Sequence, residues 1–455
     1  MVRGIFLVLL AALPAQCEWI LLKTPQLELL TDAGEKTAAR LLDRMATVRQ
    51  VLGQGPSAER PLRVFLFASE REFHTYAEGV ATGGFFQSGP ERDYIVLPSG
   101  AGFTRTVAHE YVHRILNRRA PRFPRWLDEG LAEFYSTLEV KGQNAVVGSP
   151  IEAHLTTLTN VRWLTAKELE SAAASEPLNE RELAGIFYAE SWGLVHLLQL
   201  SPKWREQTPR FLAEISAGRD EPRAFQEAFG RTLEDAIRDL HGHLPQMRTA
   251  RRESPARVHE DAPAVTKLDP LESTLERADL ALHVMKLDLA RKLFEAAART
   301  HPDSPDAEAG LGTLAMAQNR REEALTHLRH AAELRAPGGE TYFELAMLRR
   351  DEGAGATEVD QLLERAIVAD PLYAEAHLVL GQRETDRADY ARAIPHLETA
   401  AGILPRQSFI WYSLAYAQAK SGRIDAARDS ARRALQTARS PDHEHMARVL
   451  LESLE

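Results

Sequence analysis

The chain has 455 residues, of which 44% are hydrophobic and 26% are charged. This composition is typical of globular domains, and the length suggests about two to four of them. The net charge of −10 argues against general nucleic-acid binding, which needs a basic surface. The single cysteine lies at position 17, so the chain beyond it forms no internal disulfide.

Residues 1–17 have the pattern of a secretory signal peptide. A short start with Arg3 precedes an apolar run, residues 5–13, that is too short to span a bilayer, and small residues follow near Ala15. We expect cleavage after Ala15 or Cys17 and an exported protein, periplasmic or secreted. An uncleaved signal would leave it anchored by its N-terminus, and a first strand of the fold is the remaining alternative. Beyond this segment no membrane span is expected.

Next comes a segment with mixed strand and helix patterns. Alternating apolar residues predict strands, and apolar residues at helical spacing predict helices. A Gly-Pro pair separates two extended runs near its end. The expected elements are a strand in 18–29, a helix in 33–52, a strand in 61–67, a helix from 69 to 76, and two extended runs within 83–100.

Residues 104–117 are predicted to form an amphipathic helix that contains His109, Glu110 and His113 in an H-E-x-x-H pattern. Its apolar stripe consists of Val107, Ala108, Tyr111, Val112, Ile115 and Leu116. The two histidines lie four residues apart at the edge of this stripe, so they can bind one zinc ion from consecutive turns. Glu110 points to another side of the helix and is the candidate general base for a metal-activated water.

A second helix is expected to begin at Pro124, after a proline-rich connection. Glu129 is our candidate third metal ligand, and Glu133 is the candidate carboxylate that orients one of the histidines. Asp128 and Glu133 are the competing choices of ligand. Gly130 is expected to let the two helices approach closely beside the metal.

The two motifs, HEYVH and WLDEGLAEFY, resemble those of the gluzincin metallopeptidases, in particular the compact peptidase-MA-like bacterial domains. The resemblance implies an α+β domain with one zinc ion per chain, the E-G glutamate (Glu129) as third ligand, and the acid four residues later (Glu133) as the partner of a ligand histidine. The connection between His113 and Glu129 is shorter than in the large aminopeptidases, and their G-x-M-E-N motif is absent. Aminopeptidase specificity is therefore not implied.

Two further roles follow from this resemblance. Residues 94–97 would lie along the cleft and pair with extended substrate, although an ordinary core strand explains them equally well. In the helical region 186–198, Tyr188 is the candidate donor to the oxyanion. The alternatives are that Tyr188 packs on Trp192, and that His196 is the donor.

Residues 208–244 are expected to add two or three helices that complete a domain spanning 18–245. The His-Gly-His sequence at 241–243 reads as a surface turn. Residues 246–270 are rich in proline and mixed charge, and we interpret them as a linker.

Residues 271–455 show a repeat. Pro337, Pro371 and Pro405 are 34 residues apart, and small residues recur at matching places. This pattern resembles the tetratricopeptide repeat, an all-α superhelix. We expect five helix pairs, the third made irregular near residues 353–356 by a one-residue insertion, and a capping helix in 441–455. Such a superhelix offers a concave surface for a peptide or protein partner; a spacer or dimer-forming role is the alternative.

The sequence therefore predicts an exported zinc metallopeptidase that cleaves peptide bonds in a peptide or protein substrate. Its repeats would bind a protein partner or the substrate. A non-catalytic repeat scaffold with a peptidase-like binding domain is the main alternative. A zinc hydrolase acting on a non-peptide amide is a third interpretation.

Overall fold

The computed structural model describes residues 18–25, 27–52, 62–77, 83–89, 92–117, 123–174, 181–255 and 263–454. The predicted signal peptide, residues 1–17, lies outside this part of the chain. Within the described residues, no helix combines the length and the apolar character that crossing a membrane requires.

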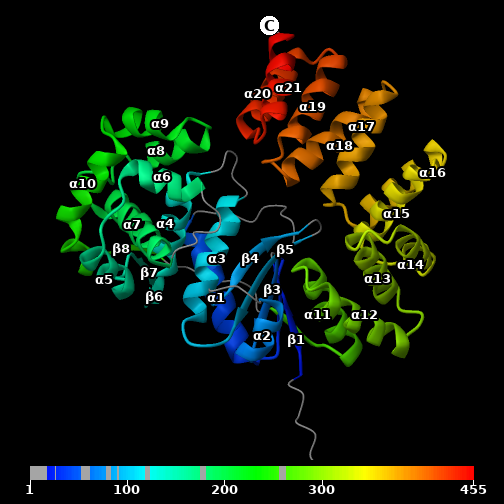
Figure 1. Cartoon of the computed structure of the whole chain (residues 1–455), viewed down its shortest axis with the longest axis horizontal. Coiled ribbons are helices and arrows are strands. Elements are labelled where there is room, and N and C mark those ends of the chain that lie inside the picture. The colour runs from blue at the N-terminus through cyan, green and yellow to red at the C-terminus, as the bar shows by residue number, and fades with distance from the viewer. Residues whose placement is uncertain are drawn as a thin grey trace, which may run out of the picture.

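A six-stranded mixed sheet forms the centre of the N-terminal region (Figure 1). β2, β3 and β5 are parallel, and the other neighbouring strands pair in antiparallel fashion. Residues 18–29, expected to form one strand, instead form most of an antiparallel hairpin. In sheet order the strands are β4 (Phe85–Ser88), β5 (Asp93–Pro98), β3 (Leu62–Phe67), β2 (Leu27–Thr31), β1 (Ile20–Lys23) and β9 (Ala264–Lys267).

This order corrects the expectation for residues 94–97. They belong to β5, which has β3 on one side and β4 on the other, so β5 has no free edge for a substrate strand. The alternative of an ordinary core strand is the correct one. The outer strand beside the helix that carries His109 and His113 is β4.

One face of the sheet is covered by α1 (Glu35–Val51) and α3 (Phe103–Asn117), whose apolar stripes pack into a large core. α4 (Arg125–Ser136) and α7 (Arg181–Leu200) extend this core into a helical lobe. The other helices of the N-terminal region are α2 (Glu70–Tyr76), α5 (Glu152–Asn160), α6 (Ala166–Ala174), α8 (Thr208–Ser216), α9 (Glu221–Phe229) and α10 (Leu233–His243).

The segment 246–270, interpreted as a linker, contains regular structure. It begins with a short 3-10 helix, Gln246–Arg248. β8 (Arg252–Pro255) then pairs with β7 (Asn144–Val147), which also pairs with β6 (Glu139–Lys141). β9 joins the central sheet beside β1. Before the repeats begin, the chain therefore pairs with strands of the N-terminal region at two places. This pairing satisfies the hydrogen-bonding groups of its backbone.

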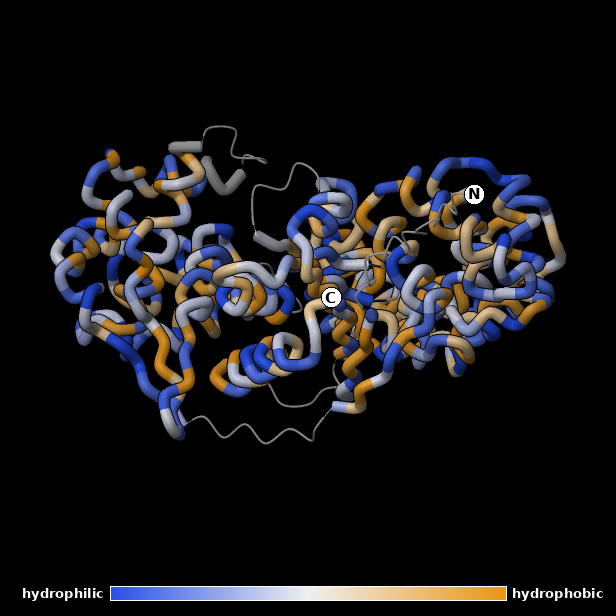
Figure 2. Tube along the Cα trace, turned by 90° about the horizontal axis from the view of Figure 1, so that it is seen from below, coloured by the Kyte–Doolittle hydropathy of each residue, from blue (hydrophilic) through white to orange (hydrophobic). Residues whose placement is uncertain are grey.

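Five helix pairs and a final helix follow in an arc (Figure 1). Figure 2 shows apolar and polar residues interspersed along the tube, as expected where amphipathic elements pack with one side buried. The pairs are α11 (Pro270–His283) with α12 (Leu287–Thr300), α13 (Pro305–Ala317) with α14 (Arg321–Glu333), α15 (Gly339–Asp351) with α16 (Ala356–Ala369), α17 (Ala374–Asp386) with α18 (Tyr390–Ile403), and α19 (Ser408–Lys420) with α20 (Ile424–Thr437). α21 (Pro441–Glu452) ends the arc.

The turns within the five pairs share one backbone feature. Each contains a residue with positive φ at an equivalent position: Met285, Asn319, Gly353, Ala388 and Gly422. Three of the four steps between them are 34 residues long, as the period requires, and the step from Gly353 to Ala388 is one residue longer. This step contains the irregularity expected in the third unit.

The first repeat packs against the face of the sheet opposite α1 and α3. Phe65 and Tyr94 of the sheet share a buried core with Ala278 and Leu282 of α11 and with Phe294 of α12. The repeats are therefore not a separate module on a flexible tether, since removing them would expose one side of the central sheet.

Candidate metal centre

α3 places the two histidines of the H-E-x-x-H motif at the edge of the core. Val107, Ala108 and Val112 are fully buried and hold the helix on the sheet. His109 and His113 lie on consecutive turns and are half-buried, as their position beside the apolar stripe predicts. Their Nε2 atoms are 3.0 Å apart.

α4 brings Glu129 to the same point. Its Oε2 atom lies 3.6 Å from the Nε2 of His109 and 3.3 Å from the Nε2 of His113. Within the part of the chain that the structure describes, these three residues form the one group of at least three potential ligands whose donor atoms lie within 4.8 Å of one another.

The spacing of these atoms fits a zinc ion. Ligand atoms about 2.0–2.1 Å from a tetrahedral ion lie about 3.3 Å from each other. The three separations here, 3.0, 3.3 and 3.6 Å, are centred on this value. In addition, the Oε2 of Glu129 is buried and has no hydrogen-bond partner. Two imidazoles and one carboxylate are also the donor set that zinc takes in hydrolases.

A carboxylate lies near the Nδ1 atom of each histidine ring. The Nδ1 of His109 lies 3.6 Å from Glu133, and the Nδ1 of His113 lies 3.5 Å from Asp128. Such partners fix the ring orientation and the tautomer that leaves Nε2 free for a metal. Asp128 and Glu133, the competing ligand choices, thus lie on the far side of the rings, and the structure groups Glu129 alone with the two Nε2 atoms.

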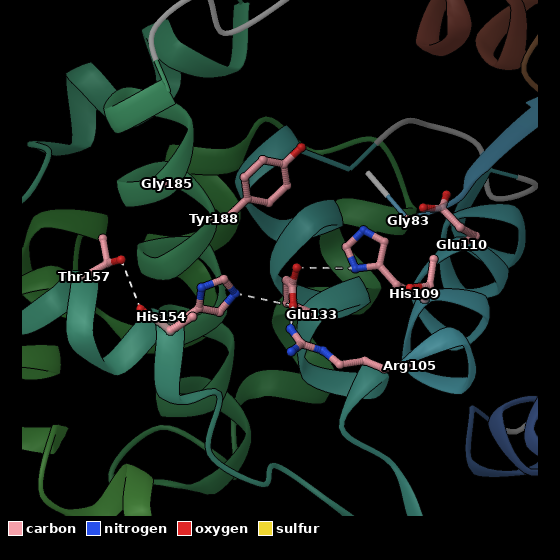
Figure 3. A pocket seen from close by; sticks show the side chains of 12 residues that line it. Gly83, Arg105, His109, Glu110, Glu133, His154, Thr157, Gly185 and Tyr188 are labelled. Carbon is pink, nitrogen blue, oxygen red and sulfur yellow. Dashed lines mark hydrogen bonds and ion pairs between the residues drawn. The ribbon is translucent and has the colours of Figure 1, made fainter. Parts of the chain in front are cut away.

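Glu133 also contacts two further side chains, Arg105 and His154, that no sequence motif pointed to. The Nη2 of Arg105 donates to its Oε2 at 2.7 Å, and the Nε2 of His154 lies 3.4 Å from the same oxygen (Figure 3). Burial opposes ionisation of Glu133, but His154, His109 and Arg105 together lower its pKa to about 2. Arg105 could have been found from its place one turn before His109. His154 could not, because α5 lies in a segment that reads only as a polar connection.

A cavity of about 580 Å³ opens beside these residues. Glu110, Tyr188, Arg105 and His154 line it, and Figure 3 shows Glu110 and Tyr188 on either side of His109. Small residues make up much of the remaining wall: Gly83, Gly102, Gly185 and Ala153. The cavity therefore has room for a substrate group beside the potential ligands.

Glu110 lies in this cavity next to the two histidines. Burial raises the pKa of its carboxyl group, while His109, His113 and a hydrogen bond from the backbone of Phe86 act in the opposite direction. Phe86 belongs to β4, so the candidate general base lies between its own helix, α3, and the outer strand β4.

Tyr188 projects from α7 into the same cavity. Burial, and then the charge of Glu129, raise the pKa of its phenol to about 12, so the hydroxyl stays protonated at neutral pH. Its ring makes an edge contact with Phe187, whereas Trp192 contacts the rings of His154 and His196. The alternative in which Tyr188 packs on Trp192 is therefore wrong.

His196, the other candidate donor, lies away from the cavity. It is fully buried, and its two ring nitrogens hydrogen-bond with His243 and with the carbonyl of Gly148. Burial and the neighbouring His243 lower its pKa to about 3, so it is neutral. His243 itself is a buried residue in the last turn of α10, and the prediction of a surface turn at 241–243 is wrong.

The family models that match this chain lie in its C-terminal part. Two models of tetratricopeptide repeats match, one over residues 285–338 and one over 378–444. The C-terminal region carries tetratricopeptide repeats. The repeat prediction is thereby confirmed. A search of curated proteins finds no match.

Several solved structures are similar to this chain at low identity. MamA is 20% identical, with 37% of this chain and 91% of MamA covered and a TM-score of 0.30. YrrB, described as a tetratricopeptide-repeat protein with an unusual peptide-binding site, is 15% identical, with 39% and 90% covered and a TM-score of 0.32. TTC0263, a tetratricopeptide-repeat protein of Thermus thermophilus, is 21% identical, with 40% and 99% covered and a TM-score of 0.29.

Both family models lie in the tetratricopeptide repeats, which indicate protein–protein interaction. Taken alone, the comparisons favour the alternative interpretation, a repeat scaffold, over a peptidase. The case for an enzyme depends on the metal centre.

Proposed function

We propose that this chain is an exported, zinc-dependent peptidase whose tetratricopeptide repeats bind a protein substrate or partner. The observation that carries the proposal is the triangle formed by the Nε2 atoms of His109 and His113 and the Oε2 of Glu129, with sides of 3.0, 3.3 and 3.6 Å. Each histidine also has a carboxylate near its Nδ1 atom, as histidines that bind a metal usually have.

His109, His113 and Glu129 would hold the ion, with Glu133 and Asp128 orienting the two imidazoles. When bound, Zn²⁺ supplies the Lewis acidity that makes a water molecule nucleophilic at neutral pH. The protein's own side chains then handle the proton and the developing charge.

Glu110 is the general base in this proposal. Its carboxylate accepts a proton from the attacking water and passes this proton to the leaving amine of the substrate. Its place in the cavity, between α3 and β4, puts it on the side where an extended substrate would enter.

Tyr188 is the proposed donor to the substrate carbonyl oxygen as this oxygen gains negative charge. The raised pKa keeps its hydroxyl protonated, and α7 directs the side chain into the cavity. A hydrolase that cuts a non-peptide amide would use the same residues, so the substrate class needs its own assay.

The competing proposal is a scaffold without catalysis, which the matches to the repeats favour. Metal content separates the two first. We expect purified protein to contain close to one zinc per chain by elemental analysis, and Glu129→Ala to lose most of it. Glu152→Ala, at an exposed position on α5, should keep the metal. Absence of zinc from wild-type protein, even after zinc is added, would leave the scaffold as the better interpretation.

Turnover is the second measurement. Glu110→Gln is expected to keep zinc and to lose nearly all hydrolysis of an unfolded protein such as reduced casein. If Glu110→Gln hydrolyses as fast as wild type, the catalytic role assigned to Glu110 is wrong.

A further inference from the structure

β4 connects the cavity to the repeats. The amide of Gly89 donates to the carbonyl of Arg92 and closes the β4–β5 hairpin. Hydrogen-bonded and non-hydrogen-bonded pairs alternate in an antiparallel ladder, so the backbone groups of Phe86 and Ser88 point away from β5. At Phe86 this outer edge already hydrogen-bonds with Glu110. One end of the outer edge of β4 therefore lies at the cavity.

The other end of β4 lies against the first repeats. The side-chain amide of Gln87 donates to the carbonyl of His283 at the end of α11. Gly89 is so close that a Cβ there would be 3.3 Å from the His283 ring. Burial raises the pKa of Asp306 on α13, whereas the nearby Arg92 lowers it. The hairpin thus ends against the C-terminal end of α11, with Arg92 near enough to Asp306 of α13 to affect its charge.

The first helices of the repeats line one side of the arc, since α11 packs on α13, α13 on α15, and α17 on α19. Three equivalent places on α15, α17 and α19 hold nine residues, of which Glu340, Glu375 and Gln382 are polar and six are apolar or aromatic. We call these six the inner stripe: Phe343, Met347, Leu378, Phe409, Tyr412 and Tyr416. Phe409 and Tyr416 are 41% and 39% exposed, although large apolar side chains are usually covered.

Acidic residues lie next to the inner stripe in the first turns of three helices. Asp306, Glu340 and Glu375 occupy in α13, α15 and α17 the place that Phe409 takes in α19. Acidic residues in a first helical turn also suit the helix dipole, and here they place negative charge beside the inner stripe. Lys420 lies over the ring of Tyr416, so its charge is directed to the aromatic face.

We propose that the cavity, the outer edge of β4 and the inner stripe form one continuous binding surface for an extended polypeptide with basic and apolar side chains. Main-chain pairing along β4 would hold the segment next to the cleaved bond. The aromatic rings would bind its apolar side chains, and the acidic residues would select its positive charge. The cavity end of this surface rests on the proposed peptidase function, whereas the inner stripe does not.

Binding of a defined probe tests the inner stripe. The probe is a fluorescein-labelled peptide of lysine, serine and phenylalanine, about 20 residues long, which spans on the order of 65 Å when extended. It is titrated by fluorescence anisotropy against full-length Glu110→Gln protein. We expect the double variant Tyr412→Ala, Tyr416→Ala to weaken binding about tenfold or more. Val368→Ala, at an 82% exposed site on α16, is the matched control and should bind normally.

The charge part of the proposal is tested with the same peptide carrying glutamate in place of lysine. The glutamate peptide should bind at least about tenfold more weakly, and added salt should reduce this difference. Equal binding of the two peptides, or no effect of the double variant, would overturn the proposal. So would self-association of the chain that buries the stripe, seen as a concentration-dependent mass by sedimentation without probe.

Hydrogen exchange tests whether the binding surface is continuous from β4 to the inner stripe. In a one-to-one complex the probe should slow exchange in both β4 and α19, and Ser88→Pro, which removes an outward-facing N–H, should weaken binding. Proline is tolerated at such edge positions. Protection of α19 alone would overturn the continuous surface. The same exchange experiment on metal-free protein distinguishes the two proposals. If the protein binds no zinc but the probe still protects β4 and α19, the binding surface is supported and the peptidase function is not.

Discussion

The backbone of Gly130 lies against the carbonyl oxygen of Ser191, so that a Cβ on residue 130 would be only 2.3 Å from this oxygen. Gly130 was expected to let α4 approach α3, but its close contact is with α7. Glu129 precedes Gly130, and Tyr188 lies one turn before Ser191. This contact therefore sets the distance between a candidate metal ligand and the candidate oxyanion donor.

Gly130→Ala should separate these helices. An added methyl group against backbone has little room to relax, and overpacking of this kind costs about 1–3 kcal/mol. We expect a melting temperature several degrees lower and weaker zinc binding, measured by calorimetry and by competition with a chelator. Gly242→Ala on α10 is the control, because no atom lies within 4 Å of its Cβ position. A Gly130→Ala protein as stable as wild type would contradict this packing.

Glu133→Gln should reduce zinc affinity. The neutral amide orients His109 less strongly, and loss of such a partner typically costs about 10- to 100-fold in metal affinity. Asp128→Asn should act similarly through His113. Glu152→Gln is the exposed control. Unchanged zinc affinity in both variants would mean that these carboxylates do not support the metal ligands.

Tyr188→Phe should lower kcat by about 100- to 1000-fold, because the substrate oxyanion loses a preorganised donor. Zinc content and KM should change little. Tyr135→Phe, whose hydroxyl accepts a hydrogen bond from Arg252 at 2.9 Å, controls for loss of a buried hydroxyl elsewhere. If kcat of Tyr188→Phe equals that of wild type, Tyr188 lines the cavity but does not donate to the oxyanion.

The contact between sheet and repeats should depend on pH through His283. Its ring lies 3.3 Å from Asp279, and Tyr94 donates to the same carboxylate at 2.9 Å. Burial would lower the pKa of His283, but Asp279 and, more weakly, Glu340 raise it from 6.5 to about 9. Protonated His283 therefore stabilises the fold. This stabilisation, on the order of 3 kcal/mol, is complete below pH 6.5 and is lost as the pH rises through about 9.

We expect wild type to melt at a higher temperature than His283→Gln at pH 6 and the difference to shrink above pH 9. A difference that stays constant from pH 6 to pH 10 would show that the protonation of His283 does not stabilise this contact.

Truncation tests whether the repeats belong to the core of the sheet. A chain ending at residue 268 would expose Phe65, Phe67 and Tyr94, all fully buried in the whole protein. We expect this truncated chain to aggregate or to unfold without cooperativity. A chain ending at residue 439, which lacks only α21, should remain folded. A soluble, cooperative 18–268 fragment would show that the N-terminal region folds alone.

Local sequence patterns were sufficient for much of the site. Helical geometry alone places His109 and His113 on one side of α3, and the E-G-x-A-E pattern points to Glu129. By contrast, nothing in the sequence around His154 relates it to Glu133, because α5 is brought beside α4 by the packing of both helices on α7, which follows much later in the chain. Its place beside the metal centre depends on contacts across the fold.

Sequence patterns were enough to identify the 34-residue repeat, the two motifs of the candidate metal site and the helical spacing of the candidate ligands, because these features depend on periodicity along one segment. Four other features became visible only in the folded structure: β4 is the outer strand next to α3, β8 and β9 pair with two different sheets, Gly130 faces α7, and the first repeat covers the sheet. Each of these depends on which surfaces meet, and this is decided by burial of apolar area between segments far apart in the chain.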